Sequence, residues 1–267
     1  MTAIQALILG IVEGVTEFLP ISSTGHLILT SKLLGIADSD FLKSFEIAIQ
    51  FGAILAVVVL YWKKLWKNKE TWKKVLVAFL PTAVIGFLLY KVLKNYLLSS
   101  STIVLWSLFL GGVILIIFEV WYKKVKSTPK INGRTFLGNS EISYKKSFLI
   151  GVWQALAIIP GVSRSGATIV GGLAMGISRE AIVEFSFLLA IPTMAAATGY
   201  DLLKNGASFS GNQIYVLILG FMVSFVVAMA AVTWFINYIK NHSFIWFGVY
   251  RIIVALLFYL LIFQFKI

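Results

Sequence analysis

The sequence contains no cysteine and little charge. Of its 267 residues, 13% are charged and 59% are hydrophobic, and the mean hydropathy is +0.92. The absence of cysteine excludes disulfides, thiolate nucleophiles and cysteine-ligated metals. The scarcity of charge excludes an ordinary soluble domain, because apolar runs of this length predict membrane-spanning helices. The first apolar run has no basic segment before it and carries two glutamates, so we expect it not to be a signal peptide.

The charges that are present are mostly positive and unevenly distributed. The formal net charge is +12, and most lysines and arginines fall in two short segments, 63–74 and 123–146. Between membrane spans, such segments indicate the cytoplasmic side. They also attract anionic lipid headgroups. We therefore expect contacts with membrane lipids and no nucleic-acid partner.

Long apolar stretches account for most of the chain. Six of them are candidates for full membrane spans: 45–62, 75–90, 102–122, 182–203, 214–239 and 244–265. Most approach the roughly 20 residues that cross the hydrocarbon core. Tryptophan and tyrosine gather at their ends, as at membrane–water interfaces. The sequence therefore predicts an all-α polytopic membrane protein, with 1–267 forming a single membrane domain.

Two further segments, 2–36 and 147–177, are each broken by a proline. The first arm of the first segment would cover roughly 25 Å, short of the ~30 Å hydrocarbon core. It also carries Glu13 and Glu17, each of which costs about 3 kcal/mol at the centre of a membrane. We therefore predict two re-entrant helix–loop–helix hairpins whose tips are buried in protein.

The two halves of the chain repeat. A shift of 141 residues, the separation of Ser22 and Ser163, superimposes the first hairpin on the second. We predict repeat 1 over about 1–122, repeat 2 over about 147–267, and a cytoplasmic linker at 123–146. With both lysine-rich segments in the cytoplasm, the hairpins enter from opposite sides, so the repeats are inverted. Inverted repeats with broken helices place a site near the midplane of the membrane.

Two carboxylates stand out in the first hairpin. Glu13 and Glu17 lie one helical turn apart, on the same face. Two close carboxylates repel each other unless a cation lies between them. A divalent cation fits, with Mg²⁺ as the expected ion and Ca²⁺ as the alternative, because such ions bind carboxylates together with substrate phosphates. A proton relay and a polar packing contact are the other interpretations.

Hydroxyl groups follow the first carboxylates. Ser22, Ser23, Thr24 and Gly25 come after Pro20 and open a helix. Hydroxyls and free backbone N–H groups at a helix N-terminus form an anion site. Gly25 would allow the backbone to approach a ligand closely. Plain N-capping is the alternative. The second hairpin has a similar set, which strengthens the prediction of anion binding: Ser163, Ser165, Gly166 and Thr168.

Two further side chains can carry chemistry. Arg164, at the tip of the second hairpin, suits bidentate phosphate binding. Alternatively, it forms an ion pair with Glu13 or Glu17. His26 lies one turn into its helix and can attack phosphorus or act as a general acid–base, unless it is structural. Arg251 is expected to snorkel or to pair internally. Two amides in apolar segments are expected to hydrogen-bond near the pocket: Gln50 and Gln154.

The chain resembles the undecaprenyl-diphosphate phosphatase family, the integral-membrane enzymes associated with bacitracin resistance. The likeness lies in EGVTEFLPISSTGH at 13–26 and PGVSRSGAT at 160–168, and it extends through QFGAILA at 50–56. It implies hydrolysis of undecaprenyl diphosphate on the outer side of the cytoplasmic membrane, with a divalent cation. By motif position it implies functional roles for Glu13, Glu17, Ser23, Thr24, His26, Ser163 and Arg164.

The sequence leaves other points open. The nucleophile can be His26, a serine hydroxyl or water, and the oligomeric state can include a homodimer. The main rival function is a polyprenyl-phosphate transporter or flippase, because inverted repeats with broken helices are transporter architecture. A lipid phosphatase of the acid-phosphatase type is disfavoured. Its downstream histidine and aspartate are matched only by His242 and Asp201, which stand in reverse order.

Overall fold

The computed structural model of the protein describes residues 1–92, 101–127, 141–205 and 209–265. Regular structure in these ranges is entirely helical, with no strand. The helices are α1 (Ala3–Thr16), α2 (Ser23–Leu33), α3 (Asp40–Lys67), α4 (Lys69–Val92), α5 (Ser101–Ser127), α6 (Tyr144–Ala155), the 3₁₀ turn η2 (Leu156–Ile158), α7 (Arg164–Ala174), α8 (Arg179–Asn205), α9 (Gly211–Asn241) and α10 (Ile245–Phe265).

The long helices are those of a membrane protein. Among the described residues, α3, α4, α5, α8 and α9 are long and apolar enough to cross a membrane. In α10 the apolar stretch runs over Ile245–Leu261 and is shorter by this measure. The prediction of an all-α, multi-pass membrane protein is confirmed. The division into six spans and two re-entrant hairpins stays a prediction.

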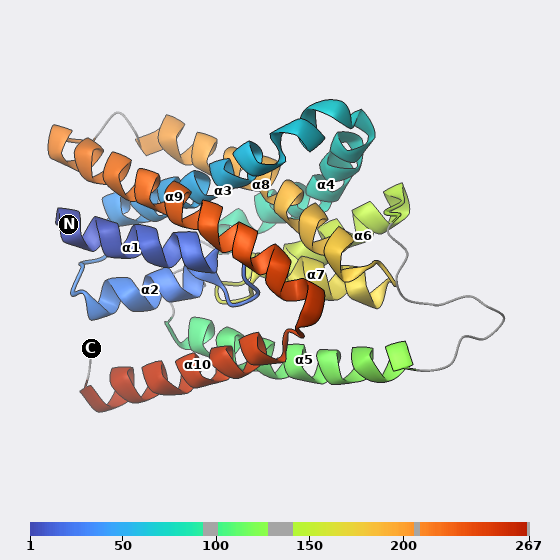
Figure 1. Ribbon diagram of the computed structural model, residues 1–267. Helices are drawn as coiled ribbons and strands as arrows, with labels where there is room; N and C mark the ends of the chain where they lie inside the picture. Colours follow the sequence, from blue (N-terminus) through green and yellow to red (C-terminus); the bar gives the residue numbers. More distant parts are fainter. Residues whose placement is uncertain (93–100, 128–140, 206–208, 266–267) are drawn as a thin grey trace.

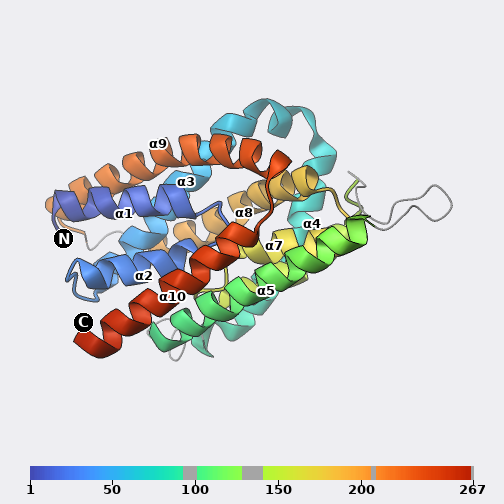
Figure 2. The same ribbon diagram turned by 60° about the horizontal axis from the view of Figure 1, so that its bottom comes forward.

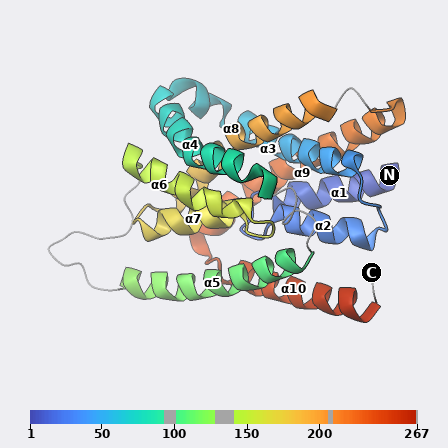
Figure 3. The ribbon, with the colours of Figure 1, turned by 180° about the vertical axis from the view of Figure 1, so that it is seen from behind.

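The remaining helices form two hairpins that meet tip to tip. Figure 3 shows α1 with α2 and α6 with α7 reaching the middle of the molecule from opposite ends. The turn between α1 and α2 contains Pro20, which has no backbone N–H for a helical hydrogen bond. The turn between η2 and α7 contains Gly161, whose φ of +91° favours a residue without a side chain. Each chain reversal therefore has a local cause in the sequence.

The helices pack around the hairpins in matching pairs. Helix α1 packs on α9, as α6 packs on α4, and α5 and α10 lie side by side as a separate layer (Figures 1 and 2). A Cβ at Gly10 would come within 2.7 Å of the Gly220 carbonyl oxygen, and a Cβ at Gly151 would overlap the Ala78 carbonyl oxygen. These glycines allow close helix packing. This is the pattern that two repeats would produce, but their boundaries and the single domain stay predictions.

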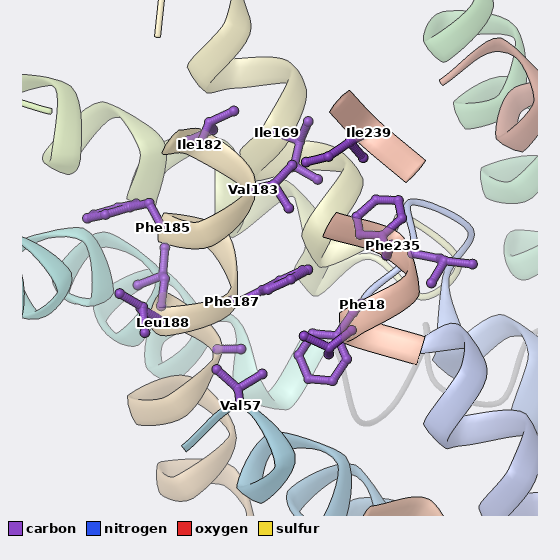
Figure 4. Close-up of a cluster of buried hydrophobic side chains, with 14 of the residues drawn as sticks. Phe18, Val57, Ile169, Ile182, Val183, Phe185, Phe187, Leu188, Phe235 and Ile239 are labelled. Carbon is purple, nitrogen blue, oxygen red and sulfur yellow. The ribbon is translucent and has the colours of Figure 1, made fainter. Parts of the chain in front are cut away.

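Aromatic packing holds the tip of the first hairpin. The ring of Phe18 contacts Phe187 of α8 edge-on, with centroids 5.0 Å apart, and Phe187 in turn contacts Phe235 of α9 at 6.1 Å (Figure 4). All three side chains are fully buried. Because Phe18 follows Glu17 and Phe187 follows Ser186, this one contact brings both polar residues to the same place.

The described parts of the two lysine-rich segments lie at one end of the molecule. Tyr144, at the start of α6, donates a hydrogen bond of 2.7 Å to Glu70, at the start of α4. The Lys74 ammonium lies 5.9 Å from the centre of the Tyr144 ring. Figure 1 shows the connection between α3 and α4 on the same side as the end of α5 and the start of α6. The side of the membrane that these segments face stays a prediction.

Candidate active site

An ion pair joins the two hairpin tips. Arg164, the first residue of α7, places Nη2 2.7 Å from Oε1 of Glu17, which caps the end of α1. Both side chains are buried. The other terminal nitrogen of Arg164 donates to the Ser186 carbonyl oxygen at 2.9 Å. The structure thus brings the carboxylate of one hairpin directly against the guanidinium of the other.

A serine hydroxyl approaches Glu17 from the other side. Ser23, the first residue of α2, donates from Oγ to Oε2 of Glu17 at 2.6 Å. Glu17 therefore lies between the Ser23 hydroxyl and Arg164. A hydroxyl, a base and a third group that orients the base form the usual arrangement of an activated nucleophile.

Glu13 has a different environment. It is fully buried, and neither carboxylate oxygen has a hydrogen-bond partner in the described part of the chain. The charged groups that face it are Glu17, Glu46 and Arg164. A buried carboxylate without a partner is costly, so this site suits a bound cation.

Whether a divalent cation fits can be tested against these side chains. The described residues contain no group of three or more histidine or acidic side chains that could hold a metal by themselves. Mg²⁺, however, is usually bound by one or two carboxylates together with waters and substrate phosphates. Glu13, whose oxygens have no hydrogen-bond partner among the described residues, and the neighbouring Glu17 could supply those one or two carboxylate ligands.

The N-termini of α2 and α7 both lie at the tips. Ser22 caps α2 and accepts a hydrogen bond from the Gly25 N–H at 3.4 Å, and Ser163 caps α7 and accepts one from the Gly166 N–H at 3.0 Å. Ser22 has a φ of 72° and is the one non-glycine residue with positive φ among those described. Such strain concentrates at functional sites. The tips therefore present two helix N-termini, which favour anions.

Other hydroxyls of the second hairpin fasten it to its surroundings. Ser163 and Ser165 donate to the Leu19 carbonyl oxygen at 3.4 and 2.8 Å. The hydroxyl of Thr168 lies 2.6 Å from that of Ser186. These groups were expected to bind substrate. In the structure they tie the hairpins to each other and to α8.

The protonation of His26 follows from its partners. Nδ1 lies 2.8 Å from the Ser22 carbonyl oxygen, and Nε2 lies 2.9 Å from the Tyr250 hydroxyl. Because a carbonyl oxygen can only accept, Nδ1 must carry the proton. In the neutral imidazole, Nε2 then accepts from the Tyr250 hydroxyl.

Two predicted amides are not brought into this cluster. The Gln154 amide donates to Thr82 at 2.9 Å and Thr193 at 3.2 Å, between α4 and α8. Gln50 is half-buried in α3, and no hydrogen bond in the described part of the chain joins it to the tips. Thr24 is also half-buried, in the first turn of α2.

Sequence reasoning missed three contacts of the site. Ser186 and Tyr250 gave no signal, because a single serine or tyrosine in an apolar helix is ordinary. Arg251 did give one, as a cation inside an apolar segment. Of the two expected arrangements, snorkelling and internal pairing, the structure shows the second: Arg251 is 3% exposed and, among the described residues, pairs only with backbone carbonyl oxygens.

Comparison with known proteins places the chain in a family. Residues 6–257 match the family described as bacitracin resistance protein BacA. A protein of Aquifex aeolicus named undecaprenyl-diphosphatase is 53% identical over 259 residues, covering 97% of this chain and 98% of the relative. Proteins of the same name from Bdellovibrio bacteriovorus and Campylobacter jejuni are 49% and 46% identical, covering 98% of this chain and 97% and 95% of their own. The chain belongs to the bacitracin resistance protein BacA family.

Proposed function

We propose that this protein hydrolyses undecaprenyl diphosphate to undecaprenyl phosphate and inorganic phosphate, recycling the lipid carrier for cell-wall synthesis. Relatives named for this activity align over nearly the whole chain. The observation that carries the proposal is Glu17, held between the Ser23 hydroxyl and Arg164 within a membrane protein. This brings a hydroxyl, a carboxylate base and a cation together at the meeting point of the two hairpin tips.

The diphosphate binds at the paired N-termini of α2 and α7. Backbone N–H groups at a helix N-terminus attract phosphate. Arg164 turns part of its guanidinium from Glu17 to the phosphate oxygens, which it can bind in bidentate fashion. Phosphoryl transfer depends mainly on positioning and on neutralising the oxygens of the transferred group. The prenyl chain lies between helices, in contact with lipid.

Glu13 and Glu17 would hold the divalent cation, Mg²⁺ or Ca²⁺. The unpartnered carboxylate oxygens of Glu13 support this assignment. When bound, the cation would neutralise charge on the phosphate oxygens and leaving group. Glu13 and Glu17 otherwise repel each other, so the substrate and the cation are expected to bind together.

Ser23 is the proposed nucleophile, and Glu17 its base. The Ser23 proton passes to Glu17 along their 2.6 Å hydrogen bond. Oγ bonds to the terminal phosphorus while the bond to the bridging oxygen breaks, releasing undecaprenyl phosphate. Water then attacks the phosphoserine, inorganic phosphate leaves, and Ser23 regains its proton. His26, one turn further along α2, serves as the general acid–base that supplies or removes a proton in these steps.

The proposal includes a location in the cytoplasmic membrane, with the lysine-rich end inside. Excess lysine and arginine between spans favours the cytoplasmic side. The clustering of Glu70, Lys74 and Tyr144 at one end supports this orientation. The first hairpin would then enter from outside, and the active site would face the extracytoplasmic side.

Phosphate release in detergent tests the proposed activity. Purified protein with Mg²⁺ is expected to release phosphate from undecaprenyl diphosphate, and S23A is expected to abolish release. The matched control is K73A, which removes an exposed lysine paired with Glu70. Hydrolysis requires no sealed membrane, whereas transport does. A folded wild-type protein that releases no phosphate but moves polyprenyl phosphate across vesicles would be a flippase, and the proposal would be wrong.

A further inference from the structure

Arg251 of α10 contacts both hairpin tips at once. Nη1 donates to the Pro20 carbonyl oxygen at 3.2 Å, and Nη2 donates to the Gly161 carbonyl oxygen at 3.0 Å. Pro20 and Gly161 are related by the same 141-residue shift that relates Ser22 to Ser163. A single guanidinium therefore holds equivalent carbonyls of the two hairpins, each two residues before the serine that caps the following helix.

The same side chain is anchored to α5. Nη2 also donates to the Ser107 carbonyl oxygen at 2.9 Å, and Nε donates to that of Leu108 at 3.3 Å. Gly111 leaves the space for this arrangement, because a Cβ there would overlap the guanidinium. The space that holds the guanidinium is therefore lined by backbone atoms of α5 and left open by Gly111. Because backbone atoms within a helix move little, the position of the guanidinium is fixed.

The charge of Arg251 has no acidic partner in the described part of the chain. Its hydrogen bonds there all go to backbone oxygens, and its side chain is buried. Removing an arginine from water without a counter-ion is costly, and carbonyl dipoles offset only part of that cost. A hydrophobic residue of similar volume would fill the space at lower cost. Packing alone does not account for an arginine here.

We propose that Arg251 is a positioning residue that clamps the two hairpin tips together, so that Ser23 and Glu17 of one hairpin are held in register with Arg164 of the other. This rests on the proposed function for its catalytic consequence. The planar fork of arginine spans two carbonyl oxygens that lie on different hairpins, whereas a lysine ammonium is a single point. Catalysis is sensitive to displacements of about 1 Å in such groups, which can reduce rates about a hundredfold.

The clamp itself can be tested without measuring activity. A Cβ at Gly166 would lie 3.6 Å from the Cβ of Pro20, a separation that a disulfide can bridge. The chain has no cysteine of its own. In the P20C/G166C protein, equilibrium with reduced and oxidised dithiothreitol gives the effective concentration of the two thiols. We expect R251M to lower it at least about tenfold. An unchanged value would overturn the proposal.

Kinetics distinguish a clamp from a residue that only supports folding. R251M is expected to lower kcat at least about a hundredfold with KM changed less than about threefold, because the phosphate-binding groups remain on each tip. R251K restores the charge but not the fork, so it is expected to recover little of kcat. Equal kcat in R251M and wild type, or full recovery by R251K, would contradict the clamp.

Two controls separate this inference from the activity on which it rests. R179M removes a partly buried ion pair with Glu119, away from the tips, and should lower thermal stability without changing the effective thiol concentration. If R179M lowers it as much as R251M does, the effect is general loosening and the proposal fails. If wild-type protein releases no phosphate, the proposed function fails, while the thiol measurement still decides whether Arg251 holds the tips.

Discussion

The Arg164 guanidinium lies 2.7 Å from the Glu17 carboxylate, although 147 positions separate the two residues in the chain. The pair is buried between the tips of two hairpins that enter from opposite ends. Because both side chains are buried, each charge depends largely on the other for stabilisation. In the proposed mechanism, an anionic substrate would compete with Glu17 for Arg164 and thereby release the carboxylate for chemistry.

Replacing Glu17 by glutamine should nearly abolish turnover. E17Q keeps the shape of the side chain but removes the base for Ser23 and the counter-ion of Arg164. We expect the rate of phosphate release to fall at least about a hundredfold, as when a preorganised charge is lost. E70Q, which alters an exposed carboxylate at the start of α4, is the matched control. Near-normal release by E17Q would exclude a direct role.

Removal of divalent cations by a chelator should abolish phosphate release. EDTA is expected to remove phosphate release and excess Mg²⁺ to restore it, because Glu13 has two buried oxygens without hydrogen-bond partners in the described chain. E13Q should weaken Mn²⁺ binding at least about tenfold in calorimetry, a readout independent of turnover. Activity that is indifferent to chelator, or equal Mn²⁺ binding by E13Q, would remove the metal from the proposal.

His26 and its hydrogen-bond partner should differ in importance. H26A removes the proposed acid–base group and should lower turnover about a hundredfold or more. Y250F removes only the hydroxyl that donates to Nε2, while the bond from Nδ1 to Ser22 keeps the ring oriented. We expect Y250F to stay within about tenfold of wild type. Y215F, at an exposed position of α9, controls for loss of a tyrosine hydroxyl. A fully active H26A would make the histidine structural.

Close packing of the second hairpin should tolerate no added methyl group. In G151A the new Cβ would overlap the Ala78 carbonyl oxygen, so α6 must move away from α4. Overpacking of this kind destabilises by about 1–3 kcal/mol, which should lower the melting temperature in detergent. G86A, on α4, would meet only the Ile158 side chain at 3.9 Å and should melt at or above wild type. Equal melting of the two variants would contradict the tight contact.

Much of the architecture could be predicted because its causes are local. Apolar runs specify membrane helices, and proline with glycine specifies where the hairpins reverse. The spacing of Glu13 and Glu17 puts them on one helix face whatever surrounds them. The hydroxyls of Ser22 and Ser163 cap the helices that follow because capping needs only the next three residues.

The partners of these groups could not be predicted in the same way. Gln154, an amide in an apolar segment, was expected to hydrogen-bond near the pocket, and in the structure its amide donates to Thr82 and Thr193. Ser163 and Ser165, which are predicted to bind substrate, donate to the Leu19 carbonyl oxygen in the structure, a contact that the sequence does not indicate. A hydrogen bond depends on ångström-level placement, and the sequence does not state which helix will supply the nearest acceptor.

The sequence by itself determined that this is a membrane protein, that its helices are interrupted at two places, and which chemical groups lie at those interruptions. Only the tertiary structure decided that Arg164 pairs with Glu17 and that Arg251 donates hydrogen bonds to the carbonyl oxygens of both Pro20 and Gly161. The physical reason is the distance along the chain over which each interaction acts. Helix breaks and caps are set by neighbours a few residues away, whereas a guanidinium binds whatever carbonyl the packing of distant helices brings within 3 Å or so.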